Sequence, residues 1–232
     1  MTLQRKALAD IVTITRASTA TYFDSAGVLQ TAGVDQPRID YDPATLLPRG
    51  FLVEEARTNL FLRSAEFDDA AWSKTNATVT ANATSTPLGL ADDLIETATT
   101  GTHGVSQLVN VTSGVTYAMS VYAKAKGRSL LRMGNATLGA YSVFDLAAGT
   151  VQHSDAGSVG RIESLGGGVY RCEVVQTATS TGSQSWILRT QSSTSEWPGS
   201  GAYTGDGVSG VSIIGGQLEA GAFATSYIPT TS

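Results

Sequence analysis

From Phe67 to its end, the chain repeats short alternations of apolar and polar side chains. Gly, Asn, Asp or Pro separates them at a spacing of roughly ten residues, which is typical of strands joined by tight turns. The clearest strand covers residues 115–124, and one of its faces, expected in the core, carries Tyr117, Met119, Val121 and Ala123. No segment has the apolar spacing of a ten-residue helix. The pattern therefore predicts an all-β fold, an antiparallel β-sandwich.

Further strands are expected at residues 76–83, 91–97, 104–111, 129–134, 140–146, 161–165, 169–178, 185–189 and 208–218. Three consecutive glycines, Gly166 to Gly168, separate two of these strands, and we expect a tight turn with positive φ there. Residues 66–72 are expected to form at most one helical turn.

The first 65 residues have a different pattern and are predicted to form a small β-rich module with a linker, followed by the sandwich in residues 66–232. Residues 10–20 alternate as in a half-buried strand, and residues 22–30 have the pattern of a hairpin around Asp24 to Gly27. These strands carry too few apolar side chains to form a core of their own. We expect them to pack on the sandwich or on a second copy of the chain, with Trp72 packing at the junction.

Composition excludes several functional classes. The formal net charge is −5, which does not favour nucleic acid or an anionic membrane. Met1 begins a polar segment without the apolar core of a signal peptide, and no apolar run is long enough to span a bilayer. We therefore expect synthesis in the cytoplasm without membrane insertion. Cys172 is the single cysteine, so no internal disulfide forms.

Nothing in the sequence indicates catalysis, and we expect no enzymatic activity. Only His103 and His153 are available as bases, and the chain lacks a G-x-S-x-G nucleophile motif. Carboxylates occur as adjacent pairs, which point to opposite faces of a strand. The G-x-G-x-x-G match from Gly205 to Gly210 leads into a strand instead of a helix, so we interpret it as a loop.

The order of the motifs resembles a family of bacteriophage virion proteins. Residues 14–43 (ITRASTATYFDSAGVLQTAGVDQPRIDYDP) and 50–60 (GFLVEEARTNL) resemble a module of head-spike and tail-fibre proteins. Residues 64–74, 114–125 and 209–230 resemble the carbohydrate-binding jelly roll that often follows it. The resemblance implies a virion fibre or spike protein, made in the host bacterium, that binds host surface polysaccharide and other virion proteins and forms a homo-oligomer. The alternatives are a structural capsid or tail decoration protein, or a polysaccharide depolymerase.

Sugar recognition uses aromatic faces framed by polar side chains. The loop around Trp197 and Tyr203 is rich in Gly and Ser, so both rings are expected to be exposed. The other aromatic candidates are Trp186, Tyr122 and Tyr141, with Arg189, Arg132 and Gln184 as polar partners. Related jelly rolls often hold a structural Ca²⁺ where the first and last strands meet. The matching positions here are Glu66, Asp68, Gln217 and Glu219.

Overall fold

The structure, a computed structural model, describes residues 13–193 and 199–231. Two six-stranded antiparallel sheets pack face to face, and the described residues contain no helix, in agreement with the predicted β-sandwich. Consequently, no described segment is a helix long and apolar enough to cross a bilayer.

One sheet, called the proximal sheet here, lies next to the N-terminal strands and has the order β14-β15-β10-β18-β7-β6. Its strands are β6 (Ala77–Thr86), β7 (Gly89–Glu96), β10 (Thr116–Lys126), β14 (Ser158–Gly166), β15 (Val169–Thr177) and β18 (Gly210–Ala220). The other, called the distal sheet, has the order β13-β12-β11-β16-β9-β5. Its strands are β5 (Ser73–Thr75), β9 (His103–Val111), β11 (Leu130–Asn135), β12 (Ala140–Asp145), β13 (Thr150–Ser154) and β16 (Gly182–Gln191). The short strands β8 (Thr100–Gly101) and β17 (Tyr203–Thr204) pair with each other.

The core lies between these two sheets. The predicted inner face of β10 is buried there, and Tyr117 packs against Trp186 of β16 with ring centroids 6.2 Å apart. Trp72 packs against Phe61 and Phe67 at 4.9 and 4.7 Å, so it belongs to the core at the junction as expected. Since Phe61 is also fully buried in this core, packing of the chain on the sandwich starts before residue 66.

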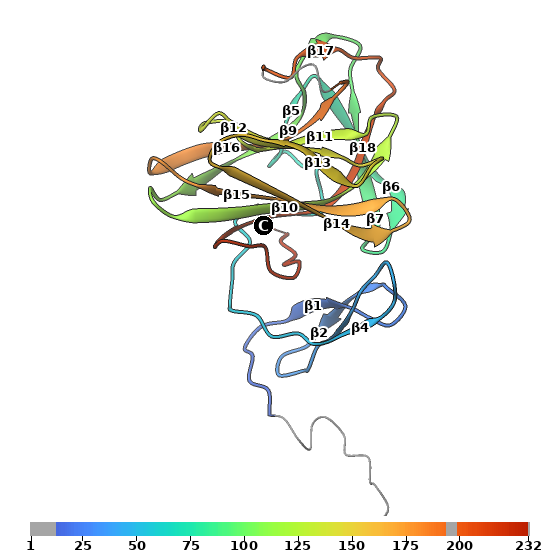
Figure 1. Cartoon of the computed structure of the whole chain (residues 1–232), viewed down its shortest axis with the longest axis vertical. Helices are drawn as coiled ribbons and strands as arrows, with labels where there is room; N and C mark the ends of the chain where they lie inside the picture. The colour runs from blue at the N-terminus through green and yellow to red at the C-terminus, as the bar shows by residue number, and fades with distance from the viewer. Residues whose placement is uncertain (1–12, 194–198, 232) are drawn as a thin grey trace, which may run out of the picture.

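The N-terminal part consists of two hairpins, β1 (Ala20–Phe23) with β2 (Leu29–Ala32) and β3 (Ile39–Tyr41) with β4 (Pro48–Phe51). The predicted hairpin at residues 22–30 is confirmed, because Phe23 pairs with Leu29 across a turn in which Gly27 has a φ of 73°. Figure 1 shows these strands next to the proximal sheet, on the side away from the distal sheet.

The strand predicted for residues 10–20 is wrong over residues 13–19, where the structure has no strand. Arg16 replaces the missing strand pairing with other hydrogen bonds. Its backbone N–H donates to Asp35 Oδ1 at 2.7 Å, and its guanidinium donates to the carbonyl oxygens of Ser18 and Gln36. The alternating pattern of residues 10–20 was not enough to form a strand, because a strand also needs a neighbouring strand with which its backbone can pair.

The three predicted turn glycines are confirmed, since Gly166, Gly167 and Gly168 have φ values of 82°, 59° and 77°. Residues 66–72 form two successive β-turns, as the N–H of Asp69 donates to the carbonyl of Glu66 and that of Trp72 to the carbonyl of Asp69.

The last residues of the chain, 221–231, lie between the N-terminal hairpins and the proximal sheet (Figure 1), and we call them the C-terminal segment. Glu54 binds this segment, accepting hydrogen bonds from the backbone N–H of Ser226 at 2.7 Å and from its hydroxyl at 2.8 Å. Arg38 donates to the same Glu54 carboxylate at 2.9 Å and to the carbonyl of Thr21 at 3.0 Å. Glu54, one of the polar residues between the two apolar runs of 50–62, thus joins its own segment to the N-terminal hairpins, through Arg38, and to the C-terminal segment.

Candidate ligand-binding surface

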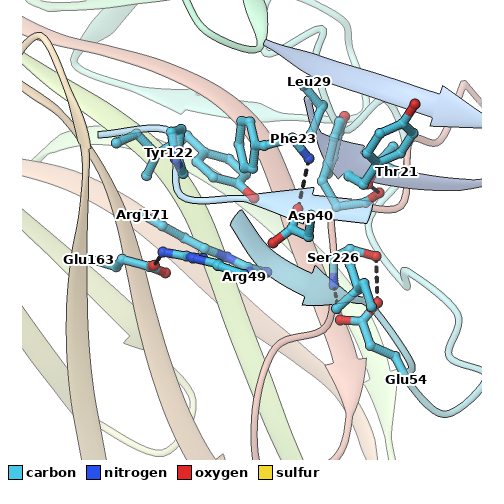
Figure 2. Close-up of a pocket in the computed structure, with 15 residues that line it drawn as sticks. Thr21, Phe23, Leu29, Asp40, Arg49, Glu54, Tyr122, Glu163, Arg171 and Ser226 are labelled. Carbon is cyan, nitrogen blue, oxygen red and sulfur yellow. Dashed lines mark hydrogen bonds and ion pairs between the residues drawn. The ribbon is translucent and has the colours of Figure 1, made fainter. Parts of the chain in front are cut away.

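A small cavity lies where the N-terminal hairpins meet the proximal sheet (Figure 2). Its volume is about 120 Å³, well below the roughly 300–1,000 Å³ of ordinary ligand pockets. Arg49 forms ion pairs with Asp42, at 3.0 Å, and with Glu163 of β14. Burial raises the pKa of Asp40, which accepts a hydrogen bond from the backbone N–H of Phe23. These paired charges hold the two parts of the chain together, and we interpret the cavity as part of that interface.

Tyr122 lies at this interface and is not available to a sugar. It was expected to be a binding residue on the face of β10 away from the core, but only 2% of its surface is exposed. Tyr227 of the C-terminal segment meets its ring edge-on at 6.3 Å, and the Arg171 guanidinium lies 5.4 Å from the ring centre. The outer face of β10 is buried because the N-terminal hairpins and the C-terminal segment cover it.

Tyr203 is also buried, contrary to the expectation of an exposed loop ring. Its hydroxyl donates to Glu96 Oε2 at 2.5 Å and lies 2.7 Å from the hydroxyl of Thr190. His103 packs against the ring at 4.6 Å, and its Nδ1 and Nε2 lie 2.7 and 3.2 Å from the carbonyl oxygens of Asn76 and Tyr203. Burial and the Glu96 hydrogen bond raise the pKa of the Tyr203 phenol. We therefore assign Tyr203 a structural role.

Trp186 and Gln184 lie inside the sandwich as well. Trp186 is 1% exposed, and Gln184 is 1% exposed with its side chain bonded to Asn135 and Ser180. The predictions of a sugar contact at Trp186 and Gln184 are therefore wrong, because these side chains face the core. Trp197 lies outside the described residues.

The structure does bring together Arg132, Tyr141 and Arg189 on the outer face of the distal sheet, and we call these three residues the arginine–tyrosine surface. Leu131 on β11 and Leu188 on β16 point into the core, so the next residue on each strand, Arg132 and Arg189, points outward. The two arginines are directly opposite each other in the register of these strands. The Arg132 guanidinium lies 3.9 Å from the centre of the Tyr141 ring, a close cation–π contact.

Backbone features fix the positions of both arginines. Arg132 Nη1 donates to the carbonyl of Gly199 at 2.9 Å. Gly104 of β9 faces Arg189 across the strand pair, and a Cβ atom on Gly104 would lie 2.8 Å from Arg189 Cγ. A side chain at position 104 would thus displace Arg189, so the glycine is required for its present placement.

The electrostatics of this surface are unusual for a structural site. Burial lowers the pKa of both Arg132 and Arg189, although each guanidinium stays protonated at neutral pH. Within the described part of the chain, Arg189 has neither an ion pair nor a hydrogen bond from its side chain. Like charges opposite each other on neighbouring strands destabilise a sheet. The arrangement can donate several fixed N–H groups to an acceptor that lies above it.

Three of the four predicted calcium ligands have other partners. Glu219 accepts hydrogen bonds from the backbone N–H and hydroxyl of Thr225, at 2.6 and 2.8 Å, and from Gln217 at 2.8 Å. Gln217 in turn accepts from the N–H of Ile228 at 2.7 Å. Both side chains thus fasten the C-terminal segment to β18.

The other two predicted ligands lie nearer the surface. Glu66 forms an ion pair with Arg63 at 3.0 Å, and Asp68 is exposed. Over residues 13–193 and 199–231, no three His, Cys, Asp or Glu side chains are grouped to hold a metal ion. The calcium site stays a prediction without support from the geometry.

Sequence reasoning missed the main structural role of Asn59 and of the Glu96–Arg128 pair. Asn59 bonds four backbone groups, and Arg128 binds both carboxylate oxygens of Glu96, at 2.6 and 2.9 Å. The available signal for Asn59 was the polar run EEARTN between two apolar runs. No comparable signal exists for the pair, whose members are far apart in the chain.

No protein-family model matches the chain, and no curated protein sequence matches it significantly.

Proposed function

We propose that this chain is a non-enzymatic attachment protein of a bacteriophage particle, a fibre or spike subunit that binds host surface polysaccharide. The binding site in this proposal is the arginine–tyrosine surface of the distal sheet. The observation that carries it is the Arg132 guanidinium held 3.9 Å over the Tyr141 ring, with Arg189 directly opposite on the next strand.

This chemistry suits a sugar. Guanidinium groups donate in a fixed fork to hydroxyl and ring oxygens, and the half-buried Tyr141 ring adds an apolar edge for C–H contacts. Because the ring and the strand register already hold Arg132, little side-chain freedom is lost when a ligand binds.

The layout of the molecule supports the same proposal. The N-terminal hairpins lie on the outer side of the proximal sheet, so they do not cover the outer face of the distal sheet (Figure 1). A subunit attached to a particle through its N-terminal part would present the arginine–tyrosine surface outward.

A glycan array with the purified chain tests the proposal, followed by affinity measurement for the best glycan. Tyr141→Ala should weaken binding by on the order of 10- to 100-fold, the usual effect of losing an aromatic anchor. Tyr41→Ala is the matched control, since Tyr41 is also partly buried but lies on β3, one of the N-terminal strands, which are next to the proximal sheet. Binding that is unchanged by Tyr141→Ala would rule out this site.

A second candidate function is a purely structural decoration protein. It is favoured by large apolar side chains exposed on the N-terminal part, namely Val28, Val34, Leu46, Leu47, Phe51 and Val53. Such a group fits contact with another virion protein or with further copies of the chain. An array on which no glycan binds, together with tight association to particles lacking the chain, would favour this function over polysaccharide binding.

A further inference from the structure

We propose that the cavity between the N-terminal hairpins and the proximal sheet binds a small primary ammonium group. In this proposal the carboxylate of Asp40 and the hydroxyl of Tyr122 accept its N–H groups. The site goes beyond the proposed function, because it shares no residue with the arginine–tyrosine surface and does not depend on it.

The first observation is a buried carboxylate with one oxygen unused. Asp40 lines the cavity and is 8% exposed. Its Oδ1 accepts the backbone N–H of Phe23 at 2.8 Å, whereas its Oδ2 accepts no hydrogen bond from the described residues. Figure 2 shows this carboxylate at the centre of the lining side chains. A buried carboxylate oxygen without a donor is costly, so a ligand N–H at this oxygen would offset that cost.

The second observation is a buried phenol without a hydrogen bond. Tyr122 lines the same cavity and is 2% exposed, yet its hydroxyl has no hydrogen-bond partner over residues 13–193 and 199–231. Buried tyrosine hydroxyls usually have one. Burial raises the pKa of this phenol, and the negative charge of Asp40 adds to the shift, so the two groups are close enough to interact. Together they offer two acceptors to one ligand.

The third observation is the charge of the cavity. Carboxylates of Asp40, Glu54 and Glu163 line it, against the guanidiniums of Arg49 and Arg171. Three negative charges against two positive ones leave a net charge of −1. A ligand with one positive charge balances it.

The two arginines are committed elsewhere and do not neutralise Asp40. Arg49 forms its ion pairs with Asp42 and Glu163, and Arg171 donates to the carbonyl of Thr225. In the described part of the chain, neither guanidinium forms an ion pair with Asp40. The uncompensated charge is therefore that of Asp40, next to the acceptor oxygen that lacks a donor.

These features favour an ammonium group over a metal ion. Ca²⁺ takes about six to eight oxygen ligands, and the cavity offers the two unused acceptors described above. A primary ammonium has three N–H donors and is attracted to aromatic rings. The rings of Phe23 and Tyr227 also line the cavity and supply that contact.

The size of the cavity limits the ligand to a short amine or to the end of a longer one. The volume is about 120 Å³, whereas one water molecule occupies about 30 Å³ in the liquid. About four non-hydrogen atoms therefore fit. Arg49 and Glu163 are exposed residues of the lining, so a ligand can enter from solvent between the hairpins and β14.

The test titrates propylammonium chloride into the whole chain and follows the backbone amide signals by NMR. The signals of Phe23 and Asp40 should shift with a dissociation constant in the millimolar range, as expected for so small a ligand. 1-Propanol, which is uncharged, and sodium chloride should bind at least about 10-fold more weakly. Equal binding of 1-propanol would overturn the charge of the ligand, and an equal effect of sodium chloride would overturn the ammonium group. No shift with propylammonium would overturn the site.

The ammonium group can belong to a free amine or to an amino sugar of a polymer. A glucosamine oligomer, titrated in the same way, distinguishes these sources. An affinity above that of propylammonium indicates the polymer, and an affinity below it indicates the free amine. Both results support an ammonium site.

Variants then place the effect on the two acceptors. Asp40→Asn keeps an oxygen for the N–H of Phe23 but removes the charge, and should weaken propylammonium binding by on the order of 10- to 100-fold. Tyr122→Phe keeps the ring and should lose several-fold. Asp35→Asn is the matched control, because Asp35 is exposed outside the cavity and the change removes the same charge. Full affinity in Asp40→Asn at an unchanged melting temperature would overturn the assignment; if that variant is unstable, full affinity in Tyr122→Phe would do so.

Discussion

Asn59 is the residue whose replacement should destabilise the chain most clearly. It is 5% exposed and joins the linker, β18 and the C-terminal segment. Its amide nitrogen donates to the carbonyls of Gly216 and Ile228, at 3.0 and 2.9 Å. Its amide oxygen accepts from the N–H groups of Phe61 and Leu218, at 3.1 and 3.0 Å. With a net value of about 1 kcal/mol for each buried hydrogen bond, Asn59→Ala should cost about 4 kcal/mol of unfolding free energy.

Urea unfolding followed by tryptophan fluorescence measures this loss. With a slope of roughly 3 kcal/mol per molar urea, the midpoint of Asn59→Ala should fall by more than about 1 M at an unchanged slope. Asn59→Asp should be worse still, because it places a carboxylate against the two carbonyl oxygens that the amide nitrogen contacts now. Asn110→Ala is the control, since Asn110 is exposed on β9. A loss below about 1 kcal/mol for Asn59→Ala, or a less severe effect of Asn59→Asp, would refute the reasoning.

Three further predictions concern other parts of the chain. Burial alone would raise the pKa of Glu96, but hydrogen bonds, chiefly from Arg128, outweigh it and hold that pKa below its ordinary value of 4.5. The ionised Glu96 carboxylate therefore adds to the free energy of unfolding above pH 4.5, and this contribution is lost as the pH falls below that value. In that acidic range, the urea midpoint of Glu96→Gln should depend less on pH than the midpoint of the parent. Gly104→Ala should destabilise by about 1–3 kcal/mol or more, since the new Cβ would lie 2.2 Å from the backbone oxygen of Leu188. Gly33→Ala, which meets only ordinary contacts, should change the same unfolding free energy by less than about 0.5 kcal/mol. Val53 is 76% exposed. If the N-terminal part binds further copies of the chain, Val53→Asp should lower the molecular mass measured by light scattering. An oligomer whose mass is unaffected by this change would place the contact elsewhere.

The candidate site could be found from the sequence only in part. Tyr141, Arg189 and Arg132 were named as candidates, but so were Tyr122, Trp186 and Tyr203, which are buried. A period of two shows that residues share a face without showing whether another element covers that face. Tyr203 looked like a loop residue because Glu96, which accepts its hydroxyl hydrogen bond, lies on a strand that is distant in the sequence.

The sequence by itself determined the local structure of this protein. Alternation predicted ten strands of the sandwich, the Asp24–Gly27 turn predicted the first hairpin, and three glycines predicted the turn before β15. These features follow from interactions between residues close in the chain, which short patterns record.

Only the tertiary structure decided which faces stay open. The C-terminal segment and the N-terminal hairpins cover the outer face of β10, so Ser120 and Tyr122 are buried there. The register of β11 against β16 places Arg132 opposite Arg189, more than fifty residues away in the sequence. Such pairings depend on the closure of long loops and on the packing of whole sheets, which no local pattern encodes.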